Sequence, residues 1–216
     1  MGRNKSVKFA EFKSFSNAFE NPESMKGNWN TTFFKNNNPI TLELGCGKGE
    51  YTLALAELFP DKNFIGIDIK GARLWHGAKT ALNNELKNTA FLRIQIENLL
   101  NYFNKNEVEE IWIPFPDPQL RERRVKKRIT GALFLKMYKQ ILKKNGVVHL
   151  KTDNQNLYDF TLNTLENLKI KILKKTTNLY SESFLNEVIS VKTTYEKKFI
   201  EIGSTIKYLK FGFSEL

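Results

Sequence analysis

The stretch Leu42-Glu43-Leu44-Gly45-Cys46-Gly47-Lys48-Gly49-Glu50 joins two segments of different periodicity. Residues 39–44 are rich in apolar side chains and predict a strand, whereas residues 51–59 carry apolar side chains at helical spacing. A strand, a glycine-rich turn and a helix begin a nucleotide-binding α/β unit. Three glycines in five positions let the backbone turn tightly and approach a ligand that a Cβ would block. We therefore expect Gly45 and Gly47 to line a cofactor site.

The spacing of these glycines excludes two common phosphate-binding loops. Lys48 is followed by Gly49 rather than by Ser or Thr, which excludes a P-loop. The third glycine comes one residue too early for the dinucleotide pattern G-x-G-x-x-G. With Glu43 before the first glycine, the pattern E-x-G-x-G-x-G resembles the first motif of class I S-adenosylmethionine-dependent methyltransferases. A plain αβ turn is the alternative, so the rest of the chain must decide.

The length and composition fit one folded domain. The chain has 216 residues, of which 41% are hydrophobic, and we expect a single domain over residues 1–216 with residues 1–38 as an N-terminal extension. No apolar run approaches the length of a membrane span, so no membrane is expected. The single cysteine, Cys46, cannot form an internal disulfide and fits the cytoplasm. Cysteine and histidine are too few for a zinc site, and no metal is expected.

The charge favours an anionic partner. The formal net charge is +11 and the isoelectric point is about 9.6, which is typical of a protein that binds nucleic acid. A general enrichment in lysine is the alternative. Residues 121–128 favour the first reading because they hold six basic residues and one acid, and no acids compensate them at helical spacing. A basic segment beside a cofactor cleft is suited to phosphate contacts.

Acidic residues follow three predicted strands. Asp68 ends the strand at residues 63–68, where a carboxylate can bind both ribose hydroxyls of a nucleoside. Asp117 follows the strand at residues 109–113 within Pro114-Phe115-Pro116-Asp117-Pro118, a stiff loop. Asp153 ends a later strand. Ligands bind at the carboxyl ends of strands in open α/β folds, so these acids mark one site.

The sequence also predicts a helical stripe near the N-terminus and a long loop near the C-terminus. Phe9, Phe12, Phe15 and Phe19 recur at three- and four-residue steps and predict a helical stripe that packs on the main domain. Residues 178–198 are polar and lie between the last two predicted strands, so we expect a long functional loop there. Simple disorder is the alternative for this loop.

Together these pieces resemble the bacterial tRNA (guanine-N7)-methyltransferase family. The pieces that carry the resemblance are Gly27-Asn28-Trp29-Asn30, the glycine loop, Ile65-Gly66-Ile67-Asp68, Pro116-Asp117-Pro118 with its basic run, Lys151-Thr152-Asp153-Asn154 and Thr193-Thr194-Tyr195-Glu196. The resemblance implies a doubly wound α/β fold with a mostly parallel seven-stranded sheet whose last strand is antiparallel. It also implies S-adenosylmethionine as methyl donor and the guanine at position 46 of the tRNA variable loop as target.

The resemblance assigns roles on the donor side. It implies that Glu43, Asp68 and Asp117 contact S-adenosylmethionine. A further donor contact falls at the end of the third strand, where the family usually has Asp and this chain has Gln95, with Glu97 two residues on. A Gln amide can still bind an amino group or a ring nitrogen.

The resemblance also assigns roles on the tRNA side. It places tRNA contacts at Arg121 and Asp153, and at the segment Thr193, Thr194, Tyr195 and Glu196. Gln119 replaces the family's aromatic residue after Pro-Asp-Pro. The chain is expected to act as a monomer or a homodimer.

Guanine N7 carries a free lone pair, so the reaction needs alignment rather than a Ser, His or Cys nucleophile. We expect Asp117 to be the catalytic carboxylate, which stabilises the positive charge of the product ring, with Asp153 or Glu196 as second choices. Three other functions remain open: a methyltransferase acting on another RNA or a small molecule, a nicotinamide dehydrogenase, and a non-catalytic RNA-binding protein. The family-specific motifs disfavour a methyltransferase with another substrate, and the glycine spacing disfavours a dehydrogenase. The acids at strand ends disfavour a non-catalytic RNA-binding protein.

Overall fold

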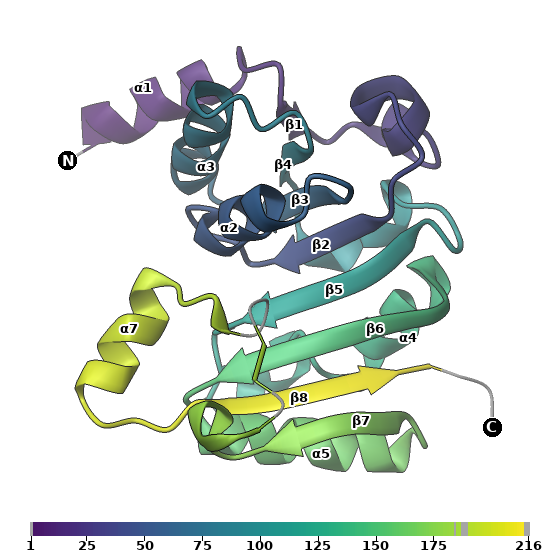
Figure 1. Cartoon of the computed structure of the whole chain (residues 1–216), viewed down its shortest axis with the longest axis vertical. Coiled ribbons are helices and arrows are strands. Elements are labelled where there is room, and N and C mark those ends of the chain that lie inside the picture. The colour runs from purple at the N-terminus through teal and green to yellow at the C-terminus, as the bar shows by residue number, and fades with distance from the viewer. Residues whose placement is uncertain (1, 184, 187–189, 214–216) are drawn as a thin grey trace.

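The computed structural model describes residues 2–183, 185, 186 and 190–213, with side chains from residue 5 onward. It contains an eight-stranded sheet with the strand order β1-β4-β3-β2-β5-β6-β8-β7 (Figure 1). The strands are β1 (Ala18–Glu20), β2 (Ile40–Leu44), β3 (Asn63–Asp68), β4 (Thr89–Arg93), β5 (Val108–Pro114), β6 (Leu142–Thr152), β7 (Lys171–Thr176) and β8 (Lys207–Gly212). Strand β8 runs antiparallel to β6 and β7, and the pairings among β1 to β6 are parallel.

Helices cover both faces of the sheet. The α-helices are α1 (Gly2–Phe12), α2 (Glu50–Leu58), α3 (Gly71–Asn83), α4 (Ala132–Ile141), α5 (Gln155–Asn167) and α7 (Thr194–Glu201). Figure 1 shows α2 in front of the sheet and α4 and α5 behind it. The described short helices are η1 (Glu23–Met25), η2 (Trp29–Phe34), η3 (Ile96–Asn101), η4 (Glu122–Lys127) and η5 (Leu179–Ser181). The doubly wound, mostly parallel fold is therefore confirmed.

The sheet has one strand more than expected because the N-terminal segment contributes β1.

Helix α1 ends at Phe12, so the phenylalanine stripe is not continuous. Phe12 is buried against α3, whereas Phe19 lies in β1 and packs edge-to-face on Trp29 with 5.1 Å between ring centroids. Ser14, Ser16 and Asn17 interrupt the helical pattern, and such residues favour turns over helix interiors. The side chain of Asn17 then donates to the carbonyl of Ala78, which fixes the chain beside α3.

The parallel strands place their carboxyl ends on one edge of the sheet. Strands β2, β3 and β4 are in register over nearly their whole length, and β5 and β6 continue the same direction. Helix α7 lies beside this edge, next to the arrowheads of β5 and β6 (Figure 1). The predicted loop over residues 178–198 includes 184 and 187–189, which lie outside the described residues, but it also contains η5 and the start of α7. No helix among the described residues is long and apolar enough to cross a membrane.

Candidate functional site

The glycine loop between β2 and α2 forms an open cradle. Gly45, Gly47 and Gly49 have φ angles of 75°, 57° and 73°, a region that L side chains rarely adopt. A Cβ at Gly45 or Gly47 would meet no heavy atom within 4 Å, whereas a Cβ at Gly49 would lie 2.4 Å from the ring of Phe91. The first two glycines therefore leave space for a ligand, and the third lets the loop pack against β4.

Asp68 lies directly against this loop. One carboxylate oxygen accepts a hydrogen bond from the Gly47 N–H at 3.0 Å, and the other accepts from the Lys70 N–H at 2.8 Å. The loop and the end of β3 are thus joined through one carboxylate. A nucleoside ribose in the cradle would lie beside the acid that the sequence predicted to bind it.

Glu43 is buried beneath the loop, with 5% of its surface exposed. Its Oε2 accepts from the N–H and the hydroxyl of Thr52, at 2.8 and 2.5 Å. Burial raises the pKa of Glu43 to about 8, the bonds from Thr52 oppose the rise, and the charges of Asp68 and Glu50 add to it. A carboxyl group with this pKa is mostly protonated at pH 7.

Gln95 lies past the end of β4 rather than within it. The strand ends at Arg93, and Gln95 precedes η3 with its side chain exposed, as is that of Glu97. Among the described contacts, neither side chain bonds to the glycine loop. Both side chains lie beyond the carboxyl end of β4, the strand that pairs with β3.

Asp117 sits in a strained loop after β5. The residues two positions before and after it, Phe115 and Gln119, have φ angles of 51° and 47°, and strain of this kind costs about 1–3 kcal/mol and gathers at functional sites. Asp117 Oδ1 accepts from the Gln119 N–H at 2.9 Å, and the Phe115 N–H donates to the carbonyl of Lys151 at 2.8 Å. The loop holds the Asp117 carboxylate at the surface.

A surface pocket of about 340 Å³ lies beside Asp117. It is lined by Asp117, Pro118, Gln119, Leu120, Arg121 and Arg124. An acid that can accept hydrogen bonds therefore shares a pocket with two guanidinium groups that can bind phosphate.

The basic run has five exposed cations rather than six. Arg128 is buried, where its Nε donates to the carbonyl of Pro118 at 2.9 Å and its guanidinium lies 4.5 Å from the ring centroid of Phe160. The other five are exposed in or beside η4, and within the described part of the chain no carboxylate lies within 4 Å of their nitrogens. They are Arg121, Arg123, Arg124, Lys126 and Lys127. Arg128 supports the Asp117 loop instead.

The segment Thr193–Glu196 forms the start of α7, and its side chains divide between surface and interior. The Thr193 hydroxyl accepts from the Glu196 N–H at 3.2 Å, which caps the helix. Thr194 is exposed and Tyr195 is 58% exposed. Glu196 points inward and is buried, so in this structure its side chain is part of the interior.

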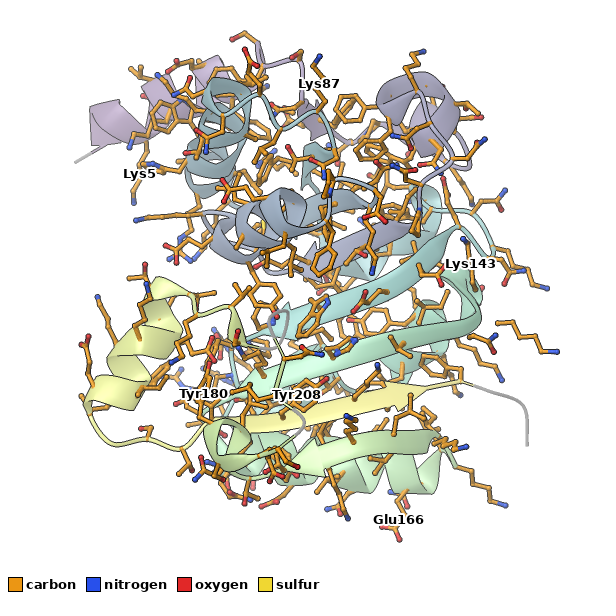
Figure 2. The ribbon with its side chains drawn as sticks, in the orientation of Figure 1. Lys5, Lys87, Lys143, Glu166, Tyr180 and Tyr208 are labelled. Carbon is orange, nitrogen blue, oxygen red and sulfur yellow. The ribbon has the colours of Figure 1, made fainter. Side chains whose placement is uncertain are left out.

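A buried ion pair holds this segment to the sheet. Lys151 Nζ lies 2.6 Å from Glu196 Oε1, and both side chains are fully buried. Lys151 also donates to the carbonyl of Val191 at 2.9 Å, and the Tyr180 hydroxyl donates to Glu196 at 2.5 Å. Tyr180 is labelled in Figure 2, near α7. Lys151 was not predicted as a site residue, although a lysine within an apolar strand is a signal that an acid must reach it.

Asp153 follows β6 at the same edge and is half-buried. Its backbone carbonyl accepts from Lys207 Nζ at 3.1 Å, and the next residue, Asn154, caps α5 by accepting from the Leu157 N–H at 2.9 Å. Asp68, Asp117 and Asp153 are thus brought to one edge, as the sequence predicted.

Cys46 is unsuited to nucleophilic catalysis. It is buried, and burial together with the charges of Glu43 and Asp68 raises the pKa of its thiol well above the usual value. His149 is also buried, 2.9 Å from Glu110 and 2.7 Å from the Tyr208 hydroxyl. Within the described residues, no group of three or more His, Cys, Asp or Glu side chains could hold a metal ion.

Residues 37–209 match a family model described as "Putative methyltransferase". A tRNA (guanine-N(7)-)-methyltransferase of Christiangramia forsetii is 47% identical over 97% of this chain and 97% of its own length. The protein of the same name from Cytophaga hutchinsonii is 45% identical over 100% of both chains, and that from Bacteroides fragilis is 44% identical over 98% of this chain and 86% of its own.

Solved structures share the fold at low sequence identity. The 16S rRNA methyltransferase KamB superposes with a TM-score of 0.63 at 12% identity, over 82% of this chain and 89% of its own. A geranyl diphosphate C-methyltransferase from Streptomyces coelicolor, solved with S-adenosyl-L-homocysteine, superposes with a TM-score of 0.53 at 14% identity, over 81% of this chain and 68% of its own.

Proposed function

Because the chain belongs to the tRNA (guanine-N7)-methyltransferase family, we propose that it methylates N7 of the guanine at position 46 in the tRNA variable loop. The methyl donor is S-adenosylmethionine. The observation that carries the proposal is the place of Asp117: its exposed carboxylate shares a pocket with Arg121 and Arg124 at the sheet edge that also holds the glycine cradle.

The donor side fits the residues present. The open cradle at Gly45 and Gly47 accommodates a ligand, and Asp68 beside it binds the ribose. Glu43 binds the cationic end of the donor, and Gln95 lies where the adenine extends. The donor supplies an activated methyl group on its sulfonium.

Catalysis rests on alignment and charge. Guanine N7 has a free lone pair, so no residue has to remove a proton before the transfer. Asp117 accepts hydrogen bonds from the guanine edge and thereby aligns N7 with the methyl group. As the ring becomes positive, the fixed negative charge of Asp117 lowers the energy of the transition state.

Two groups of residues beside Asp117 form the tRNA-binding surface. Arg121 and the other exposed cations of the basic run bind phosphates, while Asp153 and the segment Thr193–Tyr195 border the base. Tyr195 offers an exposed aromatic ring on which a base can stack. The target guanine leaves its stack in part to reach Asp117.

Methyl transfer from labelled S-adenosylmethionine to unmodified tRNA tests the proposal. A second transcript has adenine in place of the guanine at position 46. Label in the first transcript alone is the expected result. Equal label in both would overturn the target position, and label in neither would overturn the tRNA substrate.

Binding of S-adenosylhomocysteine, which keeps the donor's ammonium group, is expected to release a proton at pH 7. The pKa of Glu43 is about 8 in the free protein, and a bound cation lowers it, so the carboxyl group ionises on binding. Affinity should therefore rise with pH and level off above pH 8. Calorimetry in buffers of different ionisation enthalpy measures the release, and Glu43→Gln should abolish it. Proton uptake, or release unchanged in Glu43→Gln, would contradict the role of Glu43.

Removal of three exposed cations is expected to weaken tRNA binding and to flatten its salt dependence. The variant Arg123→Ala/Arg124→Ala/Lys127→Ala can neutralise up to three fewer phosphates, so the slope of log K against log salt should fall by about 1 for each of them. The matched control is Lys87→Ala/Lys143→Ala/Lys144→Ala. Lys87 precedes β4, and Lys143 lies at the start of β6 (both are labelled in Figure 2). They are therefore at the edge of the sheet opposite to the candidate site. Equal decreases in affinity for the two variants would contradict a specific phosphate site.

A further inference from the structure

The carboxylate of Glu50 joins the glycine loop to α7. Glu50 follows Gly49 and is the first residue of α2. Its Oε2 accepts from the Thr194 N–H at 2.5 Å, and its Oε1 accepts from the Thr194 hydroxyl at 2.9 Å. The two residues are 144 positions apart in sequence, so the contact links the first and last parts of the candidate site.

This contact completes the start of α7. The first N–H groups of a helix have no partner within it. The Thr193 side chain satisfies the Glu196 N–H, and Glu50 satisfies that of Thr194 from another element. Because Glu50 also begins α2, its negative charge lies at the positive ends of two helices, which favours this position.

Side-chain contacts hold α7 to the edge of the sheet. Phe199 stacks on Phe115 with 5.7 Å between ring centroids, and Glu196 pairs with Lys151. Both of these hold the inward side of the helix. The Glu50 contact holds its first residue and connects it to the cradle. The residue that follows Gly49 is thus bonded directly to the first residue of α7.

We propose that Glu50 is a positioning residue that couples the donor loop to the tRNA-facing segment Thr193–Tyr195. Its carboxylate is occupied by Thr194, so it acts through that residue rather than on either substrate. A bound donor fixes the loop and with it the start of α7, which raises tRNA affinity; by linkage, tRNA raises donor affinity by the same factor. The inference rests on the proposed function and adds a role that the function alone does not assign.

The test compares tRNA affinity with and without S-adenosylhomocysteine in wild type, Glu50→Ala and Glu50→Gln. Wild type should bind tRNA about five- to 150-fold more tightly with the ligand. Glu50→Ala should reduce this factor to about 1 while S-adenosylhomocysteine alone binds within about twofold of wild type. Glu50→Gln keeps one acceptor oxygen and should retain part of the coupling. Glu57→Ala, an exposed carboxylate on the same helix, is the matched control and should change nothing.

Hydrogen exchange in the protein without ligands provides a second readout. Glu50→Ala should speed exchange of the Thr194 amide, with the thermal midpoint close to that of wild type. Unchanged exchange, or wild-type coupling in Glu50→Ala, would overturn the positioning role. A loss of S-adenosylhomocysteine affinity in Glu50→Ala as large as the loss of coupling would also overturn it, because Glu50 would then belong to the donor pocket. A wild-type chain that binds the donor but methylates no tRNA would overturn the proposed function and the coupling together, whereas loss of the coupling role alone leaves tRNA methylation in place.

Discussion

Replacement of Asp117 by Asn is expected to lower kcat by about 100- to 1,000-fold, the usual effect of removing one preorganised electrostatic contact. The guanine ring gains positive charge as N7 is methylated, and Asp117 offers a fixed negative charge in the pocket where the base is proposed to bind. Asn has nearly the same shape but no charge, and it accepts fewer hydrogen bonds from the guanine edge. The decrease should therefore appear in the chemical step.

The local structure isolates this effect from folding. Asp117 Oδ1 accepts from the Gln119 N–H, and the amide oxygen of Asn can accept the same bond. The strained backbone at Phe115 and Gln119 is then unchanged. Single-turnover methylation at saturating donor and tRNA measures the step, and Asp61→Asn, in a turn before β3, is the matched control. Turnover near that of wild type would rule out Asp117 and direct attention to Asp153.

The donor side of the site was predictable because it depends on short-range patterns. Glycine spacing, an acid before the loop and an acid at the next strand end are all visible in the sequence, and parallel strands bring them to one edge. The structure joins Gly47 and Asp68 through a hydrogen bond of 3.0 Å. The same reasoning placed Asp117 and Asp153 at this edge.

The remaining features depend on contacts between distant parts of the chain. The resemblance assigned Thr193–Glu196 to tRNA contacts as a unit, and nothing in the sequence showed that the Glu196 side chain is buried. One helical turn separates the hydroxyl of Thr193 from the Glu196 side chain, and the latter finds Lys151 in the interior. Periodicity also could not show that Arg128 packs on Phe160 or that residues 18–20 add a strand to β4. The packing of Arg128 and the pairing of β1 with β4 are fixed by tertiary contacts and carry no local signal.

Replacement of Lys151 by Met is expected to lower the free energy of unfolding by about 3–5 kcal/mol, the usual cost of removing one partner from a buried ion pair. The Lys151 and Glu196 side chains are both fully buried, with 2.6 Å between Nζ and Oε1. Met fills a similar volume but leaves the carboxylate of Glu196 without its cation. The carbonyl of Val191 is also left without this donor.

The double variant Lys151→Met/Glu196→Gln separates charge from packing. A neutral Gln can still accept from the Tyr180 hydroxyl, so the double variant should regain at least half of the stability that the single variant lacks. Urea unfolding measures all three proteins. Lys143→Met is the matched control, because Lys143 pairs with Glu109 at 3.0 Å while both side chains are nearly half exposed, and it should cost less than about 1 kcal/mol.

Comparing the stability and the tRNA methylation of these three proteins also shows what the ion pair does for the site. If the double variant is stable but methylates tRNA poorly, the pair is needed to hold Thr193–Tyr195 in place rather than to keep the domain folded. If stability and methylation recover together, the pair is one of several anchors for α7, alongside Phe115 and Glu50. A single variant as stable as wild type would contradict the buried pair itself, since an uncompensated carboxylate cannot be held in the interior without cost.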